Sequence, residues 1–165
     1  SSSSAASDVY KRQSGDCGED EEGGWSDCKN DRERHEVAAW QTNNGDAMSK
    51  GEHWFSWSIY FPKDHQHLYP LSNNYGQFHQ KGGPPVFMFK ELRNGYTVVR
   101  TIGDIDYDER KLIDKKKMSG KWFDILINAK WTKKDYVFFI VCVNDKVKYD
   151  YKGPTKTEKY VYQKF

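Results

Sequence analysis

Residues 75–80, with the sequence YGQFHQ, carry an amide and an imidazole two positions apart. In a β-strand, Gln77 and His79 would share a face, because side chains alternate between the two faces of a strand. Arg34 and Glu36 repeat this spacing in an earlier segment. Amide, imidazole and guanidinium groups all donate hydrogen bonds to carboxylates. The combined pattern therefore suits recognition of a sugar acid, whereas an isolated Gln-x-His pair is more typical of a plain solvated strand face.

The acidic run at residues 104–109, DIDYDE, is a second candidate for chemistry. Alternate strand positions could bring two carboxyl groups to the ~5 Å separation of a retaining glycosidase. The run also resembles a calcium loop, but the glycine of an EF-hand does not follow at the required place. We interpret residues 104–109 as a solvated acidic turn.

His65 and His67 follow a Pro-Lys-Asp turn and could ligate a metal ion. No third ligand is evident nearby in the sequence, so we interpret them as loop histidines and assign no metal site. The sequence indicates no required cofactor, and a structural calcium ion stays an open alternative.

The segments that must position these residues have the composition of antiparallel β-strands. Aromatic and β-branched residues alternate with polar ones between turn signals such as Asn94-Gly95 and Asn144-Asp145. No segment shows a long helical period. The predicted strands cover residues 36–40, 54–61, 86–89, 96–101, 122–131, 136–143, 146–151 and 160–165. This pattern predicts an all-β sandwich or jelly roll.

Composition narrows the class of protein further. The chain has 165 residues, enough for one domain, and its aromatic content of 16% argues against overall disorder. Its longest apolar run, residues 136–143, is too short to span a bilayer as a helix. Residues 1–36 have a net charge of −5 and residues 37–165 a net charge of +7. The basic body suits an anionic partner, but no recognisable nucleic-acid module or nucleotide motif is present.

The N-terminal segment differs from the rest of the chain. Residues 1–13 resemble translated sequencing adapter rather than a signal peptide, and residues 14–30 are acidic and rich in glycine. Cys17 and Cys28 lie in this polar stretch and could pair in a secreted protein, whereas Cys142 is expected to be a buried, inert thiol. We predict a leader over residues 1–30 and a domain over residues 31–165, cut within a strand at its C-terminal side.

Five segments together resemble a known family. They read RHEVAAW, HWFSWSIYFPKD, YGQFH, GKWFDILINAKW and VCVNDKV, in that order. Their order and spacing resemble the jelly-roll polysaccharide lyases, in particular the family that holds heparin lyase I and glucuronan lyase, with alginate lyases as more distant relatives. The resemblance covers about residues 32–165.

The resemblance implies cleavage of an anionic, uronate-containing polymer by β-elimination. The C5 proton of a uronate becomes acidic enough only when the neighbouring carboxylate is neutralised. By this resemblance Gln77 contacts the carboxylate, and His79 neutralises it or acts as the base. Arg34 is a carboxylate binder that Glu36 orients.

The resemblance also extends to a late motif of the form Y-x-K-x-G-[IV]-Y. Tyr162 and Lys164 match its first tyrosine and its lysine, and the catalytic tyrosine would lie just beyond Phe165. We predict that the substrate is bound by Glu36, Tyr75, Lys81, Tyr162 and Lys164.

The sequence thus predicts a secreted, monomeric polysaccharide lyase without nucleic-acid or membrane partners. Glucuronan is the favoured substrate because the basic insertion of heparin lyases is not visible, while heparin and alginate remain alternatives. Two other classes stay open: a non-catalytic, lectin-like carbohydrate-binding sandwich, and a jelly-roll glycoside hydrolase that uses the acids of residues 104–109.

Overall fold

The computed structural model describes residues 26–30, 50–102, 106–158 and 160–164. The chain divides into two compact units, residues 1–37 and residues 38–165. Within the first unit, the 3₁₀ turn η1 (Cys28–Asn30) is closed by the Asn30 side-chain amide, which donates to the Ser26 carbonyl at 2.8 Å. Cys28 is disulfide-bonded and Cys142 is a free thiol, while Cys17 lies outside the described residues.

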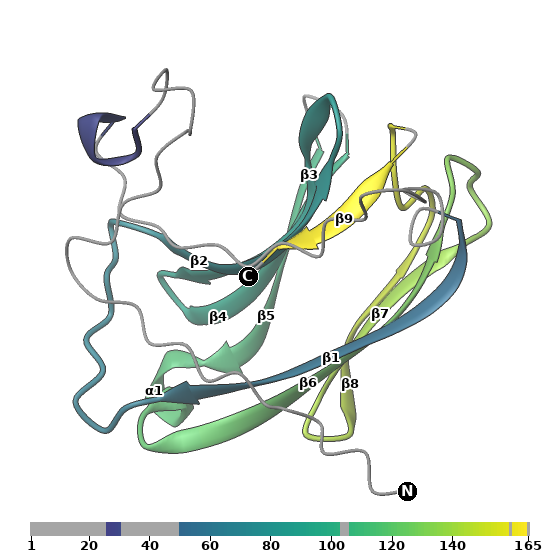
Figure 1. Cartoon of the computed structure of the whole chain (residues 1–165). Coiled ribbons are helices and arrows are strands. Elements are labelled where there is room, and N and C mark those ends of the chain that lie inside the picture. The colour runs from purple at the N-terminus through teal and green to yellow at the C-terminus, as the bar shows by residue number, and fades with distance from the viewer. Residues whose placement is uncertain (1–25, 31–49, 103–105, 159, 165) are drawn as a thin grey trace, which may run out of the picture. The chain divides into compact units, whose positions relative to one another are not determined.

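The described strands of the second unit form two antiparallel sheets (Figure 1). One sheet has the order β1 (Gly51–Phe61), β6 (Lys121–Trp131), β7 (Phe138–Val143) and β8 (Lys146–Lys152). The other has the order β5 (Asp106–Asp114), β4 (Gly95–Ile102), β3 (Gly83–Leu92), β2 (Asn73–Gln80) and β9 (Val161–Lys164). A single helical turn, α1 (Lys115–Met118), connects β5 to β6. This arrangement confirms the predicted all-β sandwich.

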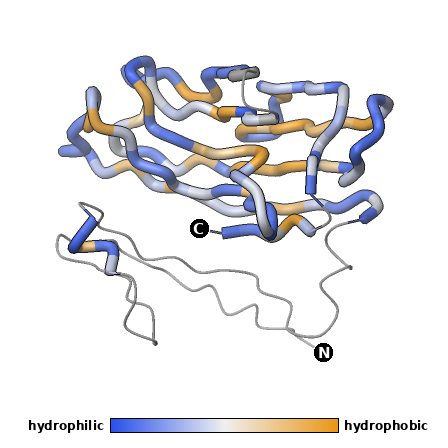
Figure 2. Tube along the Cα trace, turned by 90° about the horizontal axis from the view of Figure 1, so that it is seen from above, coloured by the Kyte–Doolittle hydropathy of each residue, from blue (hydrophilic) through white to orange (hydrophobic). Residues whose placement is uncertain are grey.

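The core lies between the two sheets and is largely aromatic. Phe87 of β3 stacks on Phe139 of β7 with ring centroids 3.6 Å apart, and Trp57 of β1 meets Phe89 edge-on at 4.9 Å. Hydrophobic and hydrophilic residues alternate along the strands, as Figure 2 shows. One face of each sheet is therefore buried against the other sheet. In the described part of the chain, no helix has the length and apolar character needed to cross a bilayer.

The turn signals in the sequence are largely confirmed. Asn144 and Asp145 join β7 to β8 with φ values of 46° and 61°, the left-handed backbone that a type I′ hairpin requires. The β3–β4 hairpin is also present, but Leu92 pairs with Gly95, so the turn lies one residue earlier than predicted.

Two segments differ from their predicted structure. The sequence GGPP at residues 82–85 predicts a turn, yet β3 begins at Gly83 and includes Pro84 and Pro85. Proline has no N–H to donate to the hydrogen-bond ladder of a sheet. The carbonyls of these two prolines accept hydrogen bonds from side chains: Gln80 donates to Pro84, and Thr101 donates to Pro85.

Residues 106–109 were also expected to form a turn. They begin β5, which pairs with β4 along its whole length. Because β5 is the edge strand of its sheet, its charged side chains can remain in solvent, so the acidic composition does not prevent strand formation.

Candidate functional site

Strand β2 holds Gln77 and His79 on the face of its sheet that points away from the core. Between them Phe78 is 1% exposed and packs in the core, and the next residue, Gln80, is fully buried. The alternation of a strand therefore directs Gln77 and His79 to the opposite face, as the sequence predicts. His79 is half-buried, whereas Gln77 keeps 9% of its surface exposed.

The imidazole of His79 has a defined proton arrangement. Its Nδ1 lies 2.8 Å from the backbone carbonyl oxygen of Gln80. A carbonyl oxygen only accepts hydrogen bonds, so Nδ1 carries the hydrogen. In the neutral ring the lone pair is then on Nε2, the nitrogen that can accept a proton.

The amide of Gln77 is held by Asn74. The Asn74 side-chain nitrogen donates to Oε1 of Gln77 at 3.1 Å. With the opposite assignment of the Asn74 amide, its nitrogen donates to the carbonyls of Gly76 at 2.9 Å and Phe89 at 3.1 Å, and its oxygen faces Gln77. Either assignment places the Asn74 amide against that of Gln77.

Strand β9 brings the late motif beside this pair. In the register of the two strands, Lys164 is opposite Gln77 and Tyr162 is opposite His79. Lys164 is half-buried, and residues directly opposite each other share a face of the sheet. Lys81 follows β2 in an exposed turn, where its backbone N–H donates to the Tyr160 carbonyl at 3.2 Å.

Tyr75 does not join Gln77 and His79. The register of β2 against β3 shifts between Asn74 and Gly76, and this irregularity breaks the alternation. The Tyr75 hydroxyl donates to Oε2 of Glu91 at 2.8 Å, and its ring lies 5.7 Å from that of the core residue Phe61. Tyr75 therefore lies apart from the pair, and its role in substrate binding stays a prediction. Arg34 and Glu36 lie outside the described residues.

Gln80 is a positioning residue that we did not predict. Its Oε1 accepts hydrogen bonds from the backbone N–H groups of Thr157 at 2.7 Å and Glu158 at 2.8 Å. Its Nε2 donates to the Pro84 carbonyl at 3.1 Å and to the Thr157 hydroxyl at 2.9 Å. This buried amide fastens the end of β2 to the segment that leads into β9. The signal in the sequence that could have revealed this role of Gln80 is an amide at a position of β2 that faces the core.

Among the described residues, the acidic side chains of residues 104–109 do not come together as a pair of carboxyl groups. Asp108 accepts a hydrogen bond at 2.8 Å from the hydroxyl of Tyr149, which belongs to β8 of the other sheet. Burial raises the pKa of Tyr149, and its hydrogen bond to Asp108 raises the pKa further. Asp108 thus links the two sheets, while Asp104 and the side chain of Asp106 lie outside the described residues.

The chain belongs to the polysaccharide lyase family, whose family model matches residues 3–165. The match extends into residues 1–13, the segment that resembles translated adapter. Comparison with curated proteins gives no significant match.

Two solved structures are similar in fold. Endo-β-1,4-glucuronan lyase from the fungus Trichoderma reesei has a TM-score of 0.56 and 17% identity, over 78% of this chain and 59% of the lyase chain. Alginate lyase AlgAT5, of polysaccharide lyase family 7, has a TM-score of 0.50 and 18% identity, over 93% of this chain and 70% of that chain. The chain therefore spans less than two thirds of the length of the glucuronan lyase.

Proposed function

We propose that this chain forms part of an enzyme that cleaves a uronic-acid-containing polysaccharide by β-elimination. The observation that carries the proposal is His79, whose Nδ1 faces the Gln80 carbonyl and whose Nε2 therefore holds the lone pair, beside the amide of Gln77 on one sheet face. Membership of the polysaccharide lyase family supports this chemistry.

Each residue of the pair has a role that its chemistry defines. The Gln77 amide stabilises the negative charge of the substrate carboxylate as the C5–H bond breaks. His79 accepts the C5 proton at Nε2, and the electron pair forms the C4–C5 double bond while the C4–O bond to the next sugar breaks. Arg34, by the family resemblance, supplies a second carboxylate contact. The leaving oxygen takes its proton from water, and we assign no side chain among the described residues to that step.

Glucuronan is the substrate class that we favour. The T. reesei structure of similar fold is a glucuronan lyase, and the AlgAT5 structure, an alginate lyase, makes alginate the second candidate. We also propose that the enzyme acts as a monomer outside the cell, where an oxidising environment would preserve the disulfide of Cys28.

The proposal is tested by incubating the protein with glucuronan, alginate and heparin and following the ultraviolet absorbance of the conjugated double bond. We expect Gln77→Ala and His79→Ala each to lower the turnover rate by at least about 100-fold, the usual cost of losing a charge-stabilising donor or a general base. His53→Ala is the matched control: this imidazole lies on β1 of the other sheet and contacts the Lys50 carbonyl.

The remaining classes give different results in the same experiment. A hydrolase would release reducing ends without ultraviolet absorbance, and a lectin would bind the polymer without either product. Near-normal turnover in both Gln77→Ala and His79→Ala would remove the pair from the site.

A further inference from the structure

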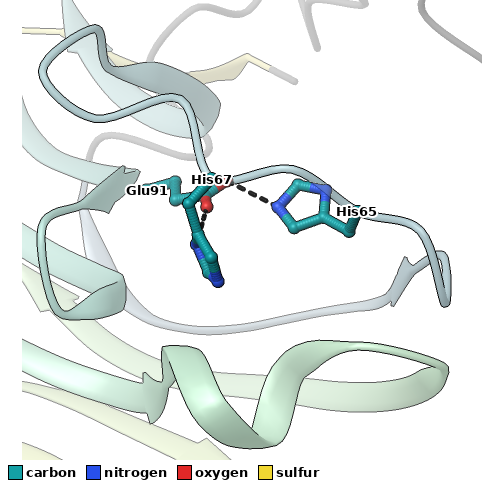
Figure 3. A group of neighbouring side chains, drawn as sticks. All are labelled: His65, His67 and Glu91. Carbon is teal, nitrogen blue, oxygen red and sulfur yellow. Dashed lines mark hydrogen bonds and ion pairs between the residues drawn. The ribbon is translucent and has the colours of Figure 1, made fainter.

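Two loop histidines and a buried glutamate meet at one point, as Figure 3 shows. His65 and His67 lie in the connection between β1 and β2, and Glu91 lies in β3. The Nε2 atom of His65 is 2.9 Å from Oε2 of Glu91, and Nδ1 of His67 contacts Oε1 of the same carboxylate. The ligand atoms of all three side chains lie within 4.8 Å of one another. Glu91 is the third ligand that the sequence did not reveal.

Glu91 requires compensation for its charge. Its side chain is only 2% exposed, and within residues 50–102 and 106–158 its ion-pair partners are these two imidazoles. Burying a carboxylate without a positive partner is costly. Tyr75 donates a third hydrogen bond, to Oε2, but a hydroxyl brings no charge. A cation at the meeting point of the three side chains would supply it.

We propose that His65, His67 and Glu91 bind a divalent transition-metal ion of the zinc class. Two imidazole nitrogens and a carboxylate are a donor set that Zn²⁺ and Co²⁺ accept, whereas Ca²⁺ and Mg²⁺ take oxygen ligands. The ion takes the place of the hydrogens that otherwise bridge imidazole and carboxylate, and each neutral ring then carries its hydrogen on the nitrogen that does not bind the ion. The Tyr75 hydroxyl then orients the ligating carboxylate, as outer partners of metal ligands commonly do.

The surroundings fit a structural ion that can enter from solvent. The His67 side chain is 32% exposed, which leaves a route to the cluster, while the His65 ring is fixed edge-on against Phe61 at 5.2 Å. Glu91 points inward from β3, because it is opposite the buried residue Tyr96 in the sheet register. The site is therefore on the other face of the sheet from Gln77 and His79. Its ion fastens the crossover from β1 to β2 and takes no part in the elimination.

The test uses chelator-treated protein without a histidine tag, to which Zn²⁺, Co²⁺ or Ca²⁺ is added. At about 100-fold excess over the dissociation constant, Zn²⁺ should raise the midpoint of thermal unfolding by about 5–10 °C. Co²⁺ should bind with the visible absorption of a nitrogen- and oxygen-ligated ion. Both effects should be lost in His67→Gln and Glu91→Gln and kept in His53→Gln, a histidine outside the cluster.

His67→Gln guards against a folding artefact. This side chain is partly exposed and glutamine can still donate a hydrogen bond to Glu91, so we expect the variant to remain folded, with an unfolding midpoint that does not respond to Zn²⁺. The proposal is overturned if neither Zn²⁺ nor Co²⁺ binds, if His67→Gln and Glu91→Gln bind them as tightly as wild type, or if Ca²⁺ alone stabilises the protein. None of these measurements depends on turnover, so they test the metal site separately from the lyase activity.

Discussion

His79 owes its orientation to the residue that follows it. The His79 ring is fixed by the carbonyl of Gln80, and the Gln80 side chain is in turn bonded to the backbone of Thr157 and Glu158. The Gln80 side chain is buried and does not lie on the reacting face. Gln80 nevertheless sets the position of the His79 imidazole, which does lie on that face. The contribution of Gln80 to folding can be separated from its effect on His79 by measuring stability as well as activity.

We expect Gln80→Leu to lower the free energy of unfolding by about 2–5 kcal/mol. The change leaves the N–H groups of Thr157 and Glu158 and the carbonyl of Pro84 without their partner, and each buried unsatisfied group costs about 1–3 kcal/mol. Urea unfolding measures the loss. The control is Gln163→Leu, a half-buried amide in β9, which should change stability by less than about 1 kcal/mol. Equal losses in the two variants would contradict the assigned role of Gln80.

Local strand periodicity predicts the positions of some residues of the site but not of others. The common face of Gln77 and His79 followed from alternation alone. Tyr75 does not lie on this face, because the register of β2 shifts beside Gly76. That shift cannot be recognised in the amino-acid sequence. Glu91 was not predicted as a ligand, because it is 24 positions from His67 and only strand pairing brings them together.

The β3–β4 hairpin depends on a glycine whose role is steric. Gly95 has φ of 124°, and a Cβ atom there would lie 2.2 Å from the Ile113 carbonyl oxygen and 2.6 Å from the Lys115 nitrogen. Because β5 and the start of α1 pass so close, no side chain fits at this position. The hairpin and the neighbouring edge strand are therefore packed through backbone atoms.

We expect Gly95→Ala to destabilise the protein by at least about 2 kcal/mol more than Gly82→Ala, as measured by thermal or urea unfolding. Both glycines have positive φ, but a Cβ at Gly82 meets nothing within 4 Å. Gly82→Ala therefore carries only the conformational cost of about 1 kcal/mol. Similar losses for the two substitutions would show that the close approach at Gly95 is relieved by small backbone shifts.

Strands with a buried face were predictable and an exposed edge strand was not. The aromatic and β-branched composition of residues 54–61 predicts β1, and the apolar run of residues 136–143 predicts β7. In the structure, more and less exposed residues alternate along both strands. The start of β5 carries three acids among its first four residues, which favoured a turn. Its pairing with β4, the strand directly before it in the chain, depends on how the two strands dock, and the composition of residues 106–109 does not indicate it.

On the scale of the whole molecule, charge is the property most relevant to the proposed substrate. Residues 37–165 carry a net charge of +7, and an acidic polysaccharide would be attracted to this part of the chain. The all-β sandwich and the polysaccharide lyase family, both predicted from the sequence, are confirmed. The division of the chain at residues 37 and 38 depends on contacts in space, and composition placed the boundary at residue 30 instead.

We expect affinity for glucuronan to fall about three- to tenfold when salt rises from about 50 to about 200 mM, since exposed charges are screened. Calorimetric titration at several salt concentrations measures this, with an uncharged glucan as the control that should not bind. Salt-independent binding, or equal binding of the uncharged glucan, would mean that charge does not govern recognition.

The pairing of β2 with β9 has a consequence for biosynthesis. Glu158 bonds to a residue 78 positions earlier, and contacts between such distant segments form late because a long loop must close first. The β3–β4 hairpin, by contrast, requires only neighbouring residues. We therefore expect the β3–β4 hairpin to form early during synthesis and β9 to join β2 later, so that the surface bearing the amide and the imidazole is completed after the local hairpins.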